Sequence, residues 1–360
     1  MNAFRTDGAD GAGRPDMVDW DLAVRIGSRV AGEGPTVGRG EAPAIVEELR
    51  EGADRSTGLV RDFTGLVAQD HGPGRGAPVL VVDRPGWVQA NADAFSTLLA
   101  PIVDKLTEKK PPTGITAAIG SRITGAEVGG VLGFLGSKVL GQFDPFHEPD
   151  GRLLLVAPNI VQVERELEVD PHDFRLWVCL HEETHRVQFT AVPWMRDHMF
   201  GQIQKFAATM EPSGLLEDGI SRLLDGLKNA RSGGSLLDVV GTPEQKELLD
   251  GLTGVMSLLE GHADVVMDGV GPTVIPSVAA IRAKFNQRRK GVGVLDKLLR
   301  RVLGLDAKMA QYRDGAAFVR AVVDKAGMPG FNVVWEQPEH LPSRAEITDP
   351  DAWMARVLRT

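Results

Sequence analysis

Cysteine is almost missing from this sequence, because Cys179 is the only one in 360 residues. An intrachain disulfide is therefore impossible, and a zinc site built from several cysteines is excluded. Positive charge is also in short supply: the formal net charge is −9, which argues against a general nucleic-acid-binding surface. With 42% hydrophobic and 25% charged residues, the composition is that of a soluble globular protein. The shortage of cysteine fits a reducing cytoplasm.

Long uncharged hydrophobic runs are missing as well. Residues 114–141 are rich in small and apolar side chains, and this segment has glycines four residues apart, as in closely packed membrane helices. Charges at Arg122, Glu127 and Lys138 leave no uncharged run of about 18 residues. We therefore expect buried, closely packed helices of a soluble protein; a helix at a membrane surface is the less favoured alternative. Residues 1–16 lack the apolar core of a signal peptide and predict a disordered leader in a cytoplasmic chain.

Residues 17–360 are predicted to form a single domain that is mainly α-helical with a small β-sheet, of the α+β class. The apolar run Leu153–Ala157 predicts a strand, and a second short apolar run covers 79–83. Residues 194–245 leave room for a helical subdomain. Apolar periodicity and capping residues predict helices at 20–31, 42–70, 95–110, 170–191, 194–228, 243–269, 276–304 and 307–327, and a short helix is expected to close the C-terminal segment.

The segment VCLHEETHRVQF, residues 178–189, contains two histidines four residues apart. On a helix, His181 and His185 lie on one face and can present both imidazoles to one metal ion. Glu182, beside the first histidine, can reach a metal-bound water and act as its general base. Two surface histidines on an ordinary amphipathic helix are the alternative. The apolar flanks of the segment favour the metal site, since buried histidines need polar partners.

A second segment, MSLLEGHADVVMD (256–268), could complete such a site. Glu260 and Asp264 are four residues apart on one helical face within an apolar stretch. Glu260 would supply a third ligand beside the two histidines and leave an open position for water. Asp264 could accept the spare ring N–H of a liganding histidine. An acidic pair on a helix surface is the alternative. The combined pattern predicts one Zn²⁺ in this chain.

Two further side chains are candidates for contact with a substrate or a transition state. His262 lies two residues after Glu260 and could give a hydrogen bond to a substrate or intermediate. Tyr312 is the only tyrosine in the chain, so it is the only phenol that could stabilise an oxyanion.

The segments HEETH and EGHAD resemble those of the gluzincin branch of zincin-like metallopeptidases. This resemblance implies a zincin-like metallopeptidase fold with zinc bound by His181, His185 and Glu260. It also implies that Glu182 is the general base and acid and that Asp264 is the hydrogen-bond partner of a ligand.

The resemblance extends beyond the two motifs. The segment LLLVAPNI is similar to the strand above the active-site helix of such folds, whose edge would bind an extended peptide. Over about residues 15–358, the chain resembles the actinobacterial zincin-like metallopeptidases called type 2. Some members of that family are labelled hydrolases associated with deazaflavin-coenzyme biosynthesis.

These patterns predict a zinc-dependent metallohydrolase, and more narrowly a peptidase that acts on a peptide or protein substrate. The alternative is a catalytically inactive zincin-fold protein that binds a ligand or has an auxiliary role in coenzyme metabolism. Glu182 favours the enzyme, because a purely structural metal site would not need a carboxylate there. No nucleic-acid or membrane partner is expected, and nothing in the pattern indicates an oligomeric state.

Overall fold

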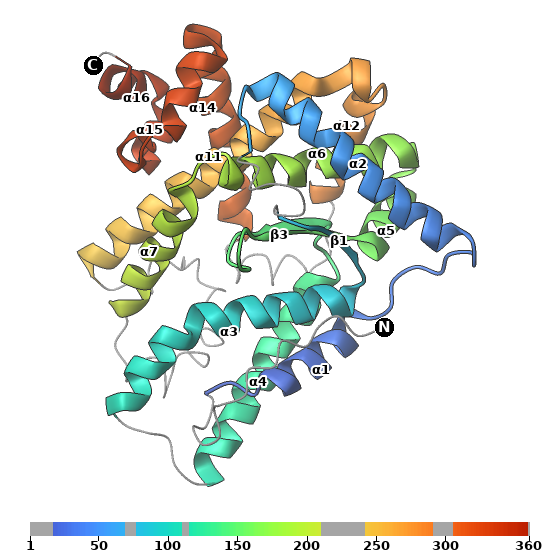
Figure 1. The fold of residues 1–360 in the computed structure, drawn as a ribbon, viewed down its shortest axis with the longest axis vertical. Helices are drawn as coiled ribbons and strands as arrows, with labels where there is room; N and C mark the ends of the chain where they lie inside the picture. The colour runs from blue at the N-terminus through green and yellow to red at the C-terminus, as the bar shows by residue number, and fades with distance from the viewer. Residues whose placement is uncertain (1–16, 69–76, 110–114, 210–241, 291–304, 359–360) are drawn as a thin grey trace.

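The computed structural model describes residues 17–68, 77–109, 115–209, 242–290 and 305–358. They form a mainly helical protein with one three-stranded sheet (Figure 1), which confirms the predicted α+β class. The predicted leader lies outside the described residues. The same holds for 210–241, the larger part of the predicted subdomain.

The helices occupy most of the segments in which apolar periodicity predicted them. Two helices were not predicted: α5, which follows directly after the last strand, with Pro158 in its first turn, and the short α15 near the C-terminus. The helices are α1 (Trp20–Ala31), α2 (Glu41–Thr64), α3 (Arg84–Lys109), α4 (Ile115–Gly136), α5 (Ala157–Leu167), α6 (Pro171–Thr190), α7 (Met195–Ala208), α11 (Pro243–Val274), α12 (Val278–Lys290), α14 (Leu305–Asn332), α15 (Arg344–Thr348) and α16 (Pro350–Val357), with short 3-10 turns η2 (Val333–Trp335) and η3 (Pro338–His340).

The sheet has the order β1-β3-β2, with β1 at Val79–Val82, β2 at Gly141–Asp144 and β3 at Arg152–Val156. β1 pairs with β3 in parallel, and β2 pairs with β3 antiparallel. The predicted strand is therefore the central one, and both of its edges are occupied by neighbours. The prediction that its edge would bind a peptide was wrong, and β2 is the outer strand on that side of the sheet.

β3 buries side chains on both faces of the sheet. Leu153 and Leu155 belong to a core that includes residues of α2, α5 and α6. Leu154 and Val156 belong to a second core with residues of α1, α3 and α4. Figure 1 shows the same division, with α6 and α2 on one side of the sheet and α1, α3 and α4 on the other. The sheet is thus enclosed between two helical layers.

Helix α6 begins at a capping residue that the sequence predicts, and it is largely buried in the molecule. The Asp170 side chain accepts a hydrogen bond of 3.0 Å from the Asp173 backbone N–H, and Pro171 occupies the first turn. Phe174 and Leu180 are fully buried. The helix packs between α2 and the strands β2 and β3. The polar side chains of α6 are therefore enclosed by neighbouring elements.

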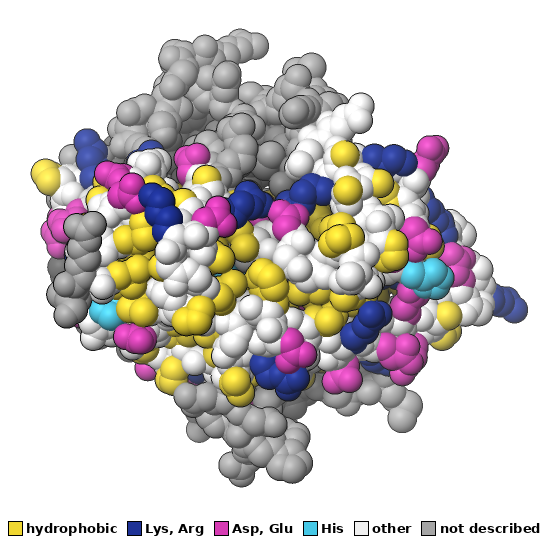
Figure 2. All heavy atoms as spheres, turned by 90° about the horizontal axis from the view of Figure 1, so that it is seen from above, with side chains coloured by type: hydrophobic (Ala, Val, Ile, Leu, Met, Phe, Trp, Pro, Cys, Tyr) yellow, Lys and Arg dark blue, Asp and Glu magenta, His cyan; other side chains and the backbone are white. Residues whose placement is uncertain are grey.

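The structure confirms the close packing that the small residues of helix α4 predicted, but not the burial of the whole helix. A Cβ added at Gly129 would lie 2.5 Å from the Ala23 carbonyl oxygen of α1, so these two helices meet at backbone distance. The other face of α4 is not buried, because Ile119 and Ile123 are 53% and 55% exposed. No helix in the described part of the chain has both the length and the apolar character needed to span a bilayer. On the face shown in Figure 2, acidic and basic side chains of the described residues are interspersed.

An ion pair between α2 and α6 gives a pH-dependent contact far from the histidine motif. His172 Nδ1 lies 2.5 Å from Glu48 Oε1, and this hydrogen bond with the Glu48 charge raises the pKa of His172 above its usual value. The protonated form is the paired one. The stabilising contribution is therefore fully present below a pH of about 6.5 and is lost as the pH rises through the pKa of the folded protein.

We expect Glu48→Gln to return the His172 pKa toward its usual value, as measured by NMR titration of the histidine ring. Added salt should weaken the shift in the parent, because this pair is exposed. Equal His172 pKa values in the parent and in Glu48→Gln would contradict the contact.

Candidate metal centre

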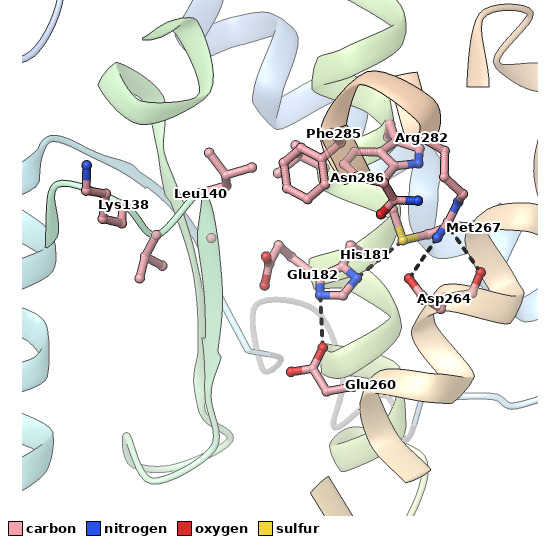
Figure 3. Close-up of a pocket in the computed structure, with 14 residues that line it drawn as sticks. Lys138, Leu140, His181, Glu182, Glu260, Asp264, Met267, Arg282, Phe285 and Asn286 are labelled. Carbon is pink, nitrogen blue, oxygen red and sulfur yellow. Dashed lines mark hydrogen bonds and ion pairs between the residues drawn. The ribbon is translucent and has the colours of Figure 1, made fainter. Parts of the chain in front are cut away.

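Helices α6 and α11 bring two histidines and one glutamate together. His181 Nε2 and His185 Nε2 are 3.2 Å apart, and they lie 3.6 and 3.8 Å from Glu260 Oε2. One nitrogen of each histidine and one carboxylate oxygen of Glu260 all lie within 4.8 Å of one another. In Figure 3 a dashed line joins the neighbouring side chains of His181 on α6 and Glu260 on α11.

The donor atoms suit a small divalent cation. Ligands about 2.0–2.1 Å from a tetrahedral zinc ion would be about 3.3–3.5 Å apart, close to the spacing found here. Two imidazoles and one carboxylate are also the donor set of known catalytic zinc sites, which keep a further position for water. The residues therefore fit zinc without rearrangement of their helices.

Helix α11 reaches this position through a close crossing with α14. The helix begins with a capping box in which Thr242 and Gln245 exchange hydrogen bonds with each other's backbone N–H groups. One turn after Ser257, a Cβ added at Gly261 would lie 2.1 Å from the Gly315 carbonyl carbon of α14. Glu260 directly precedes this contact point, so the crossing sets where its carboxylate lies.

Glu182 occupies a tight space between α6 and strand β2. A Cβ added at Gly141 would lie 2.5 Å from Glu182 Cγ, so only glycine leaves room for this side chain. Burial, assisted by the charge of Glu260, raises the pKa of Glu182 to about 8, against the opposing effect of His185. The charge of a cation on the neighbouring donors would lower that pKa again. A carboxyl group poised near neutral pH suits general acid–base chemistry.

His185 is held from both sides. Its Nδ1 lies 2.9 Å from Gln188 Oε1, and its Nε2 faces His181 and Glu260. Burial alone would lower the pKa of His185, but the hydrogen bond with Glu260 and its charge outweigh burial and raise the pKa to about 9. The chain itself therefore draws positive charge to this point, either as a proton or as a cation.

Asp264 does not have the role that the sequence predicted. Its Oδ1 accepts a 3.1 Å hydrogen bond from Arg282 Nη1 of α12, and its backbone carbonyl accepts from Nη2 of the same side chain. The oxygen that holds His185 Nδ1 belongs to Gln188, and His181 Nδ1 lies 3.3 Å from Met267 Sδ. Asp264 instead joins α11 to α12 at the wall of the pocket.

The structure places one of the two candidates for substrate contact, His262, and does not describe the side chain of the other, Tyr312. His262 is fully buried, stacked on Phe331 and against Trp335, and its Nδ1 faces Gln188. Burial lowers the pKa of His262 to about 3, so its ring is neutral. Because the side chain is fully buried, it is also out of reach of a substrate. Tyr312 lies in helix α14, but its side chain is outside what the structure describes.

Sequence reasoning missed Gln188, Gly141 and Arg282. For Gln188 a signal existed, because the third residue after His185 lies next to it on a helix. No local signal marks Gly141 or Arg282, which reach the site from other elements.

A cavity of about 340 Å³ opens beside His181 and Glu260, two of the three donor residues. Its lining, drawn in Figure 3, combines His181, Glu182 and Glu260 with apolar side chains of α6 and α12, among them Trp177 and Phe285. In Figure 3, Glu182 extends from α6 toward the segment that carries Leu140, on the sheet side of the cavity. A molecule bound in this cavity would therefore meet His181, Glu260 and Glu182 together.

Comparisons with known proteins point the same way. A family model described as zincin-like metallopeptidase matches residues 18–354. A solved structure from Chloroflexus aurantiacus, described as "a putative hydrolase with a novel fold", is 32% identical; the match covers 95% of this chain and 99% of that one, with a TM-score of 0.70. Among curated proteins, none matches the sequence.

A helical fold around a small sheet, with two histidines and a glutamate meeting beside a buried glutamate, is the arrangement of a zincin-type protein. The family match spans nearly the whole described chain. The protein belongs to the zincin-like metallopeptidase family.

Proposed function

We propose that the protein is a zinc-dependent hydrolase that cleaves peptide bonds. The observation that carries this proposal is the meeting of His181, His185 and Glu260 within 4.8 Å of one another, with Glu182 at the same cavity. When bound, zinc would polarise a carbonyl group and acidify a water molecule. One ion held by these three residues is the cofactor that we expect.

Glu182 would transfer the protons of the reaction. Its carboxylate would take a proton from the water whose oxygen attacks the carbonyl carbon, and then give that proton to the peptide nitrogen, so that the C–N bond breaks and the nitrogen leaves as a neutral amine. The tight contact with Gly141 holds the carboxylate in place, and the enclosed position shields it from bulk water. Such proton transfer contributes rate factors of about 10² to 10⁴.

Strand β2 supports a peptide as the substrate. It is one of the two edge strands of the sheet in the described part of the chain, and it is the one that begins at Gly141, against Glu182. An extended peptide could pair with this strand through main-chain hydrogen bonds, which recognise a backbone rather than one particular side chain. This placement would bring a scissile bond next to Glu182.

A digest of a peptide library by the zinc-loaded parent and by Glu182→Gln tests the proposal. We expect the parent to cleave a subset of peptides, and Glu182→Gln to keep zinc and lose at least about a hundredfold in rate. Glu166→Gln, which makes the same change on α5 at a residue paired with Arg288, is the control and should cleave as the parent does.

Unchanged cleavage in Glu182→Gln would contradict the mechanism. A parent that binds zinc but cleaves no peptide would instead favour the catalytically inactive binding or auxiliary protein that the sequence left open.

A further inference from the structure

We propose that Gln188 is a positioning residue that selects which nitrogen of His185 binds the metal, an inference that rests on the proposed metal centre. Gln188 lies one turn after His185 on α6, and its side chain is fully buried. Its amide contacts three groups: the Leu259 carbonyl, His185 and His262. Together, the three contacts determine which ring nitrogen carries the hydrogen in His185 and in His262.

The Leu259 carbonyl orients the amide. Gln188 Nε2 lies 2.9 Å from Leu259 O, which has no hydrogen and can only accept. The NH₂ group of the amide must therefore face α11, and the amide oxygen must face the other way. A flipped amide would set two carbonyl oxygens against each other, so the usual ambiguity between oxygen and nitrogen is removed.

The amide oxygen in turn determines the hydrogen on His185. Gln188 Oε1 lies 2.9 Å from His185 Nδ1, and because this oxygen only accepts, Nδ1 must carry the hydrogen. In the neutral ring the lone pair is then on Nε2. This is the atom that lies 3.8 Å from Glu260 Oε2. The buried amide thus presents the correct nitrogen to the cation.

The second amide hydrogen anchors Gln188 to the aromatic core. Gln188 Nε2 lies 2.9 Å from His262 Nδ1, which accepts and so leaves the His262 hydrogen on Nε2. The ring of His262 is held by Phe331 and Trp335, with centroid distances of 5.3 and 5.4 Å. Helix α11 therefore supplies the ligand Glu260 and also both contacts that orient the amide behind His185.

Two substitutions separate this role from packing. Gln188→Met has a similar length but offers His185 no oxygen, so we expect zinc affinity to fall about 10- to 100-fold, as for other groups that orient a metal-binding histidine. Gln188→Glu keeps an oxygen opposite His185 Nδ1 but places another against Leu259 O. It should therefore be less stable than the parent and still bind zinc more tightly than Gln188→Met.

The experiment measures zinc affinity by competition with a chromophoric chelator, alongside urea unfolding of each variant. Thr184→Val is the matched control, because Thr184 is equally buried on α6 and its hydroxyl donates to Leu180 O. It should bind zinc as the parent does. A two-bond ¹H–¹⁵N spectrum of the zinc-loaded parent should show His185 with hydrogen on Nδ1 and metal on Nε2.

Several results would overturn the inference. These are parent-like affinity in Gln188→Met, losses of affinity that simply follow loss of stability in both variants, or a spectrum with the nitrogens of His185 reversed. A parent that binds no zinc would overturn the proposed function and this inference together. Zinc binding without hydrolysis would count against the proposed peptidase alone, since none of these measurements depends on turnover.

Discussion

Glu260→Gln is expected to bind zinc at least about a hundredfold more weakly than the parent. The substitution replaces the only anionic donor of the three with a neutral amide and leaves two histidines. Removal of a group that merely orients a ligand costs about 10- to 100-fold in metal affinity, so removal of a ligand should cost more. Zinc content after dialysis and chelator competition measure the effect.

Asp264→Asn is the matched control for this prediction. It makes the same carboxylate-to-amide change one turn further along α11, at the wall of the same cavity. Because Asp264 contacts Arg282 and not a histidine ring, the variant should bind zinc nearly as the parent does. If Glu260→Gln and Asp264→Asn lose affinity equally, the assignment of Glu260 as the third ligand is wrong.

Gly261→Ala is expected to lower the free energy of unfolding by about 2 kcal/mol. The added Cβ would lie 2.1 Å from the Gly315 carbonyl carbon and 2.4 Å from the Ala316 nitrogen. Both are backbone atoms, so α11 and α14 would have to move apart, and overpacking of this kind is costly. Alanine's better helix propensity offsets only about 1 kcal/mol.

Urea unfolding followed by circular dichroism measures this effect. Gly251→Ala is the control, because Gly251 is exposed on the same helix and an added Cβ would meet nothing within 4 Å. That variant should be as stable as the parent or slightly more stable. Gly261→Ala should also weaken zinc binding, since Glu260 is carried by the displaced turn. Equal stability of the two variants would contradict the close crossing.

The fold was predictable where its signals are local. Asp170 and Pro171 mark the start of α6, and the apolar spacing of its residues indicates a buried helix. Strand β2 was missed because four residues, GQFD, with a single large apolar side chain show no clear alternation. β3 was predicted as a strand, but the two strands that pair with it were not predicted, because strand order depends on pairing between distant segments.

The sequence by itself determined the chemistry of the candidate centre. The separation of His181 and His185 by four residues places them on one helical face through backbone geometry alone, and Glu260 sits in an apolar helix that leaves its charge in need of a cation. These are properties of short segments, so no tertiary contact was needed to infer them.

Only the tertiary structure decided which side chains support that centre. Gln188 and not Asp264 contacts His185, His262 is enclosed in the aromatic core, and Gly141 brings β2 against Glu182. The reason is physical: each contact joins residues of different helices or strands, or depends on which turn of α11 faces α6. The position of α11 in turn depends on how closely it can approach α14 at Gly261, which is a property of packing.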